Sequence, residues 1–281
     1  MINDSAQKSF AQFGFPSIEE PVAPARHVRS IAVTSGKGGV GKTNFAVNVA
    51  LELGRLGRSV TLLDADLVLA NTNVLLGIKP VYHVGHLLAG RCALEDVVID
   101  VGQGVRLIPG SNGMEEIAHL SFQQHRQFVS ELEMLEDGAD FMLIDTPSGM
   151  GDNVLGVLAA ASEIIVVTMP EPTAIIDAYA LIKTIHQHSP SKPIWVVVNS
   201  VVGPDDGQAI FLQLNNVART FLCHRLNYLG SVIRDNSLVE AVKEQRPIVD
   251  YAPGKPASRS FRLIAKYLDK SSIVPARRTG R

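Results

Sequence analysis

The chain has 281 residues, of which 46% are hydrophobic and 19% charged, and its formal net charge is -2. This length allows a core that buries about three quarters of the unfolded surface, and the charge argues against a general affinity for nucleic acid or acidic lipid. Two isolated cysteines exclude a disulfide framework and a C-x-x-C cluster site. No run approaches the ~20 apolar residues of a membrane span. We expect a cytoplasmic protein, with a peripheral position at the inner face of the cell membrane left open.

The segment 1–28 differs in composition from the rest of the chain. It is polar, contains three prolines and shows no periodicity, so we expect a flexible N-terminal arm. Phe10, Phe13 and Phe15 leave two interpretations open, a leader without a role or a peptide that docks on a partner. We expect a second flexible segment at 271–281.

From residue 29 onward, predicted strands and helices alternate. Most strand candidates are continuous apolar runs, which is typical of strands buried on both faces of a parallel sheet. The expected strands cover 30–35, 59–64, 105–109, 140–145, 163–169, 193–199 and 229–233. The expected helices cover 43–57, 121–137, 153–161, 173–186, 208–225 and 256–269, with Thr173 as an N-cap. The pattern predicts one doubly wound α/β domain over 29–270, with a single, mostly parallel sheet, helices on both faces and ligands at the carboxyl ends of the strands.

A glycine-rich segment lies between the first predicted strand and the first predicted helix. It reads GKGGVGKT and fits the phosphate-binding pattern G-x-x-x-x-G-K-[ST]. Its backbone N–H groups can cradle phosphates, the second lysine can reach the β- and γ-phosphates, and the threonine hydroxyl can bind Mg²⁺. The expected nucleotide-binding residues here are Gly36, Lys37, Gly38, Gly39, Val40, Gly41, Lys42 and Thr43.

Three later strands end in residues that suit the same chemistry. Asp64 and Asp66 follow one strand, where one carboxylate can support the Mg²⁺ shell and the other can orient a water molecule. Asp145 ends a run of four apolar residues, which is the Walker-B pattern for a metal-supporting carboxylate, and the glycines after it suit a switch loop. Asn199 carries an amide that can donate and accept at once, which suits an adenine edge, although a plain turn residue stays open.

With its additional lysine, Lys37, the glycine-rich segment resembles the deviant Walker A motif of the MinD/ParA family of P-loop NTPases. Three further segments are similar to a flagellar branch of that family, the FlhG/FleN regulators of flagellar number. They are DADLVLANTNVLLGI at 64–78, PEPTAIIDAYALIK at 170–183 and YLGSVIRD at 228–235. The likeness covers about residues 30–268.

The resemblance implies a slow, Mg²⁺-dependent ATPase that works as a switch. ATP would drive a sandwich homodimer, and Lys37 would reach across to the nucleotide of the partner copy. Asp66 would polarise the attacking water, and Asn199 would contact adenine. Thr43, Asp64 and Asp145 are the expected Mg²⁺-supporting residues.

The resemblance also implies binding partners, and it leaves alternative functions open. The flagellar branch implies as partners a signal-recognition-type GTPase (FlhF), an enhancer-binding activator of flagellar genes, or both. A MinD-like septum-site ATPase and a ParA-like DNA-partitioning ATPase remain alternatives, although the net charge disfavours direct DNA binding. A metal-cluster carrier would need paired cysteines, which this chain lacks. A stripe near the C-terminus is predicted to pack in the core rather than on a membrane: Phe261, Ile264, Ala265 and Leu268.

Overall fold

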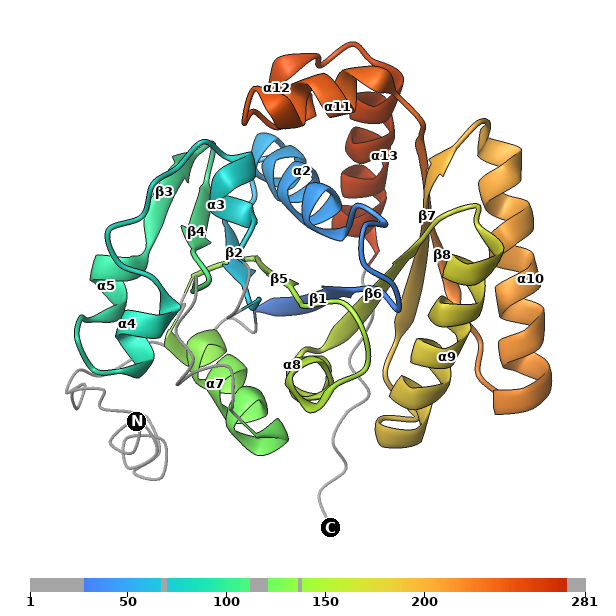
Figure 1. Cartoon of the computed structure of the whole chain (residues 1–281), viewed down its shortest axis with the longest axis horizontal. Helices are drawn as coiled ribbons and strands as arrows, with labels where there is room; N and C mark the ends of the chain where they lie inside the picture. Colours follow the sequence, from blue (N-terminus) through green and yellow to red (C-terminus); the bar gives the residue numbers. More distant parts are fainter. Residues whose placement is uncertain (1–27, 67–69, 112–120, 136–137, 272–281) are drawn as a thin grey trace.

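The computed structural model describes residues 28–66, 70–111, 121–135 and 138–271. An eight-stranded sheet runs through its centre in the order β3-β4-β2-β5-β1-β6-β7-β8 (Figure 1). The strands are β1 (Arg29–Thr34), β2 (Val60–Asp64), β3 (Ile99–Gly102), β4 (Val105–Ile108), β5 (Phe141–Asp145), β6 (Glu163–Thr168), β7 (Ile194–Val201) and β8 (Asn227–Ile233). All neighbours pair in parallel except β3, which runs antiparallel to β4 at the edge.

The parallel strands confirm the expectation from their continuous apolar runs. Every residue of β2, β5 and β6 is buried, because helices cover both faces of the sheet. All seven expected strands are present. The antiparallel edge strand β3 was not predicted, because it has only four residues and its Asp100 is exposed.

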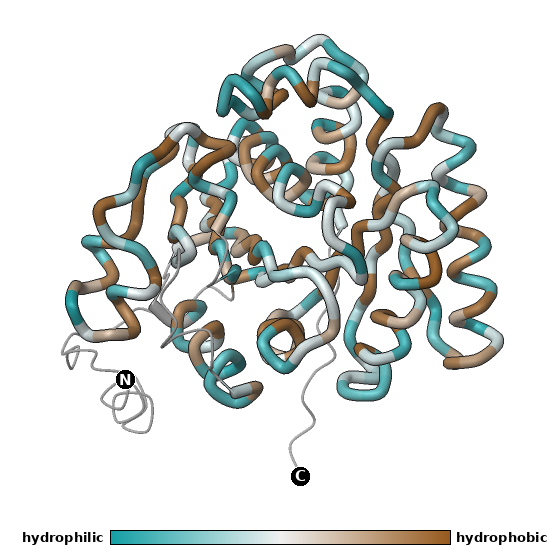
Figure 2. Tube along the Cα trace, in the orientation of Figure 1, coloured by the Kyte–Doolittle hydropathy of each residue, from teal (hydrophilic) through white to brown (hydrophobic). Residues whose placement is uncertain are grey.

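Helices fill two layers, one on each face. The longer ones are α2 (Lys42–Arg55), α7 (Phe122–Leu135), α8 (Asp152–Ala160), α9 (Pro172–His188), α10 (Pro204–Leu222), α11 (Asn236–Lys243) and α13 (Pro256–Lys270). The short ones are α3 (Thr72–Leu75), α4 (Val84–Leu88), α5 (Leu94–Val97) and α12 (Ile248–Tyr251). Helices α7 to α10 pack on one face together with α4 and α5, and α2, α11, α12 and α13 pack on the other. In Figure 2 hydrophobic and hydrophilic residues alternate along α9 and α10, as expected for helices with one side against the sheet.

Two helix starts differ from the prediction. Helix α9 begins at Pro172 with Glu171 as its N-cap, so Thr173 lies inside the first turn and the N-cap assignment was wrong. Helix α10 begins at Pro204, four residues before the predicted start. In both cases proline occupies the first helical position, where its missing N–H and fixed φ are well tolerated.

The C-terminal helix α13 completes the domain. Its apolar stripe is buried against α2 and the sheet, which confirms the prediction of core packing. At its end, the Arg29 guanidinium pairs with Glu163 and donates to the Leu268 carbonyl at 2.6 Å and the Ser271 hydroxyl at 3.2 Å. The start of β1 and the end of α13 are thus held together. Among the described helices, none has the length and apolar character needed to cross a membrane.

The strand order decides which chain segments meet at the carboxyl edge. Strand β5 lies between β1 and β2, so the phosphate loop after β1 has the β5 end as its direct neighbour. The end of β2 lies one strand further away, with Asp64 opposite Asp145 in the register. On the other side of β1 come the ends of β6 and β7.

Candidate nucleotide site

The glycine-rich segment forms the turn between β1 and α2. Gly39 and Gly41 have φ values of 80° and 87°, which residues with a Cβ rarely adopt. Gly36 lies against α9, where an added Cβ would come within 2.3 Å of the Asp177 carbonyl oxygen. The turn therefore requires glycine at these positions, and it places successive backbone N–H groups at the start of α2, where anions bind favourably.

A buried ion pair joins this turn to the end of β5. The Lys42 ammonium lies 2.9 Å from Oδ1 of Asp145, and both side chains are largely buried. Burial holds the pKa of Asp145 above its ordinary value, although the Lys42 charge and the Thr43 side chain oppose this rise. Lys42, the adjacent Thr43 and Asp145 therefore lie together at this edge of the sheet.

Asp64 is fully buried at the end of β2. Its carboxylate accepts hydrogen bonds from the backbone N–H groups of Asp66, Asn71 and Thr72 at 3.0–3.1 Å. Burial and the neighbouring Asp145 raise the pKa of Asp64 to about 7, against the opposing effect of these hydrogen bonds. The Asp64 carboxylate therefore holds the loop after β2 to the start of α3, whereas Asp66 is only partly buried beside it.

Asn199, at the end of β7, lies next to the phosphate loop. Its Nδ2 donates to the Val40 carbonyl at 2.7 Å, and its Oδ1 accepts from the Ser200 N–H at 2.8 Å. The predicted residue is therefore at the site, with its amide directed at the loop.

Lys37 differs from Lys42 in its surroundings. Its ammonium lies 2.9 Å from Oε2 of Glu171 and 3.2 Å from the Thr173 hydroxyl, both at the start of α9. The Lys37 and Glu171 side chains are 39% and 48% exposed. Sequence reasoning missed Glu171, because no local pattern links two residues that are 134 positions apart.

The segment after Asp145 also contacts the phosphate loop. The Gly149 N–H donates to the Ser35 carbonyl at 2.9 Å, and Gly149 has a φ of 105°. The Ser148 hydroxyl lies close to Gly38, 3.5 Å from the position that a Cβ would take. The segment after Asp145 is thus bonded to the start of the turn at Ser35 and lies beside Gly38 within it.

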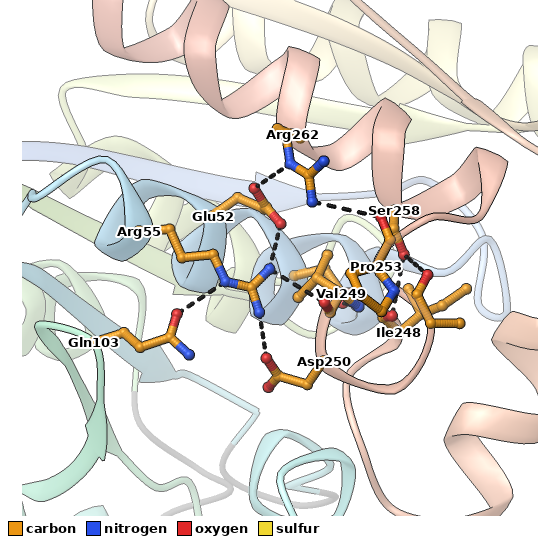
Figure 3. A network of polar contacts seen from close by, with 11 residues as sticks. Glu52, Arg55, Gln103, Ile248, Val249, Asp250, Pro253, Ser258 and Arg262 are labelled. Carbon is orange, nitrogen blue, oxygen red and sulfur yellow. Dashed lines mark hydrogen bonds and ion pairs between the residues drawn. The ribbon is translucent and has the colours of Figure 1, made fainter.

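The far end of α2 is fixed by a second group of charges (Figure 3). The buried Glu52 carboxylate binds Arg55 and also Arg262 of α13, whose Nε lies at 3.2 Å. Arg55 continues the network to the Gln103 side chain at 2.9 Å, the Val249 carbonyl at 3.2 Å and the Asp250 carboxylate. The helix that carries the phosphate loop at one end is therefore held at its other end by the β3–β4 turn, α12 and α13.

Known proteins are similar to this chain in sequence and in fold. An AAA domain family model matches residues 28–193, and a model described as NUBPL iron-transfer P-loop NTPase matches residues 118–269. The chain is 41% identical to the antiactivator FleN of Pseudomonas aeruginosa over 90% of each chain. It is 34% identical to the flagellum site-determining protein YlxH of Helicobacter pylori, covering 86% of this chain and 82% of that one.

Solved structures of cell-division ATPases superpose on the same fold. MinD of Pyrococcus furiosus matches with a TM-score of 0.73 and 26% identity over 86% of this chain and 98% of that chain. MinD of Pyrococcus horikoshii, solved with Mg-ADP, matches with a TM-score of 0.73 and 25% identity over 89% and 99%. The phosphate loop with its two lysines, the sheet order and these relatives agree, and the chain belongs to the MinD/ParA family of P-loop ATPases.

Proposed function

We propose that this protein is an ATP-driven, dimerising switch that regulates flagellar number or placement, or the expression of flagellar genes. The similarity to FleN and YlxH, over nearly the whole of the described chain, supports the flagellar role. The geometry of the two lysines supports the switch. Lys42 is bound to its own chain at a buried carboxylate, whereas Lys37 lies in the open on the same edge of the sheet.

The observation that carries the proposal is the character of the surface around Lys37. Met150, Ile176 and Val202 follow β5, β6 and β7 at the carboxyl edge, and they are 44%, 66% and 84% exposed. Exposed apolar side chains that follow three strands, on the edge that carries the phosphate loop, suit a contact with another protein. A second copy of this chain, closing on this edge, would cover them and bring Lys37 to the nucleotide of the partner copy.

Within one copy, the residues of the site have separate roles in the proposal. The loop N–H groups and Lys42 bind the β- and γ-phosphates, and Asp66 orients the attacking water. Thr43 and Asp145 fit a Mg²⁺ site, because a hydroxyl and a buried carboxylate oxygen lie together beside the phosphate position. When bound, Mg²⁺ would neutralise charge on the phosphates. Asp64 would support this site from β2, where it holds the Asp66 loop.

Loss of the γ-phosphate would then be sensed by the segment after Asp145. The Gly149 N–H is bonded to the Ser35 carbonyl, Ser148 lies beside Gly38, and the exposed Met150 follows them. A shift of this segment on hydrolysis would alter the apolar surface and open the dimer. In the proposal, an FlhF-type GTPase or an activator of flagellar genes reads the closed form.

The test is the oligomeric state of the purified chain. Asp66→Ala with MgATP is expected to elute as a dimer in size-exclusion chromatography with light scattering, and as a monomer without nucleotide. Lys37→Ala in the same background is the matched control, expected to bind MgATP and stay monomeric. A dimer that forms equally well without nucleotide, or in the Lys37→Ala background, would contradict the switch.

The flagellar role is tested in the organism. Deletion of the gene is expected to change the number or position of flagella, and the Lys37→Ala variant is expected not to restore them. A normal flagellar pattern with misplaced septa would favour the MinD-like alternative. ATP-dependent, salt-sensitive retention on non-specific DNA would favour the ParA-like one.

A further inference from the structure

We infer that Asn199 is a positioning residue for the phosphate loop, whose amide holds the Val40 carbonyl and so supports binding of the phosphates of any nucleotide, whatever its base. The inference rests on the proposed function, since it concerns how the same site binds its nucleotide. It assigns Asn199 a different task from the adenine contact that the sequence predicts.

The first argument is the direction of the Val40 peptide. Val40 lies between the two left-handed glycines, Gly39 and Gly41, and its carbonyl accepts from Asn199 at 2.7 Å in a buried position. Because a trans peptide is planar, this carbonyl and the N–H of Gly41 point to opposite sides. By holding the Val40 carbonyl, Asn199 therefore turns the Gly41 N–H away from its own amide. The Gly41 N–H is one of the successive N–H groups that form a concavity for phosphate.

The second argument is that the Asn199 side chain is itself held in place. Its Oδ1 accepts from the Ser200 N–H at 2.8 Å. Ser200 has a φ of 60°, a left-handed conformation that is uncommon for residues other than glycine. The pairing of β7 with β8 is irregular between Val198 and Val201, around this residue. Backbone strain of this kind persists where the surroundings hold it, and it clusters at functional sites.

The third argument is the close approach of the amide to Gly41. A Cβ at this position would come within 2.4 Å of Nδ2 of Asn199. The amide thus fills the space behind the loop, on the side of β7. One N–H and one lone pair of the amide oxygen are bonded within the chain, so the protein itself fixes the orientation of the amide without a base.

The experiment compares nucleotides that share a diphosphate and differ in the base. Affinities of wild type and Asn199→Ala for MgADP, MgIDP and MgUDP are measured by calorimetry. The unsatisfied Val40 carbonyl is expected to weaken all three by the same factor, on the order of 10-fold. The ratios among the three affinities are expected to stay as in wild type.

Two further variants separate positioning from folding. Asn199→Asp keeps the acceptor for the Ser200 N–H but sets a carboxylate against the Val40 carbonyl, so it is expected to weaken all three nucleotides at least as much. Asn215→Ala is the matched control, because Asn215 is equally buried at 9% exposure and its Oδ1 accepts from the Leu226 N–H at 3.0 Å. It is expected to lower the thermal midpoint and leave the nucleotide affinities unchanged.

A loss confined to MgADP would overturn the inference and support the adenine contact. Unchanged affinities in both Asn199 variants would also overturn it. If Asn199→Ala does not fold, the same comparison with Asn199→Asp decides. A wild-type chain that binds none of the three nucleotides would instead overturn the proposed function, so the two failures are distinguishable.

Discussion

The two ends of α2 carry charges that are used in opposite ways. At the C-terminal end, Glu52 and Arg55 are bonded to α12, α13 and the β3–β4 turn, and the network closes on itself. At the N-terminal end, the partly exposed Lys37 ammonium contacts the Glu171 carboxylate and the Thr173 hydroxyl, and Lys42 is paired with a carboxylate that suits a metal ion. The charged side chains at the C-terminal end of α2 find their partners within the chain, whereas those at the N-terminal end are placed to bind a ligand.

This difference shows how the two ends of one helix divide their tasks. At the phosphate loop, the Lys37 ammonium has only partly exposed partners, and the buried pair of Lys42 with Asp145 serves ligand binding as well as stability. The C-terminal end of the same helix is held in place by its charge network, since buried charge-assisted hydrogen bonds are among the stronger polar contacts. Substitutions at the two ends should therefore differ in how they change the free energy of unfolding and the affinity for nucleotide.

The largest effect is expected from Lys42→Met. It removes the phosphate-binding ammonium and leaves the buried Asp145 carboxylate unpaired. Nucleotide affinity should fall about 100-fold, and the free energy of unfolding by about 3 kcal/mol. Calorimetry with MgADP and urea unfolding measure these two quantities. Adding Asp145→Asn should restore stability without restoring affinity, and a double variant that binds nucleotide normally would refute the assignment of Lys42.

The next effect is expected at the other end of the helix. Glu52→Gln weakens the charge-assisted bonds to Arg55 and Arg262 and should lower the free energy of unfolding by about 2 kcal/mol. The affinity for MgADP should stay at the wild-type value, because the substitution lies at the far end of α2. Urea unfolding and calorimetry on the same sample test both. A matching loss of affinity would show that the two ends are coupled.

A matched pair of glycines sharpens the comparison. Gly39 and Gly57, near the two ends of α2, have φ values of 80° and 82°, and a Cβ at either would meet no atom of the described residues within 4 Å. Alanine at either position should therefore lower the free energy of unfolding by about 1 kcal/mol through backbone strain alone. Only Gly39→Ala should weaken MgADP binding. Equal affinities in both variants would count against the loop as the phosphate site.

The smallest effect on stability is expected from Glu171→Gln. An exposed ion pair contributes within about 0.5 kcal/mol, so urea unfolding should hardly change. Removal of the carboxylate frees Lys37, and the ATP-dependent dimer should form at a slightly lower protein concentration in light scattering. The shift should vanish in the Lys37→Ala background. A weaker dimer would mean that Glu171 contributes to the closed form.

The regular part of the fold could be predicted because both faces of the sheet are covered. Burial on both sides makes strands such as β1 and β5 largely apolar, and the carboxyl ends of these two neighbouring strands place Lys42 and Asp145 at one edge. Strand β3 and the helices α3, α4, α5 and α12 have four or five residues, which is too short for a helical or alternating period to appear.

The remaining parts of the site depend on contacts between distant segments. Lys37 meets Glu171 and Val40 meets Asn199 across 134 and 159 positions of sequence. Both contacts exist because β6 and β7 lie on the same side of β1, and no local sequence pattern specifies this strand order. The proline that begins α10 was a usable signal, since Pro204 is followed by Asp205 and Asp206, and acidic residues are favoured in a first turn.

Arg29 joins the two ends of the described domain at the amino edge of the sheet, through its bonds to the Leu268 carbonyl and the Ser271 hydroxyl. The chain segments before residue 28 and after residue 271 are thus attached at neighbouring points. The phosphate loop lies at the other edge, one strand length away, about 17–20 Å for five or six residues. A short linker that joins 271 to 28, with new termini opened at another loop, could therefore give a circular permutant, and fluorescent labels at the original ends could follow dimerisation at a distance from the nucleotide.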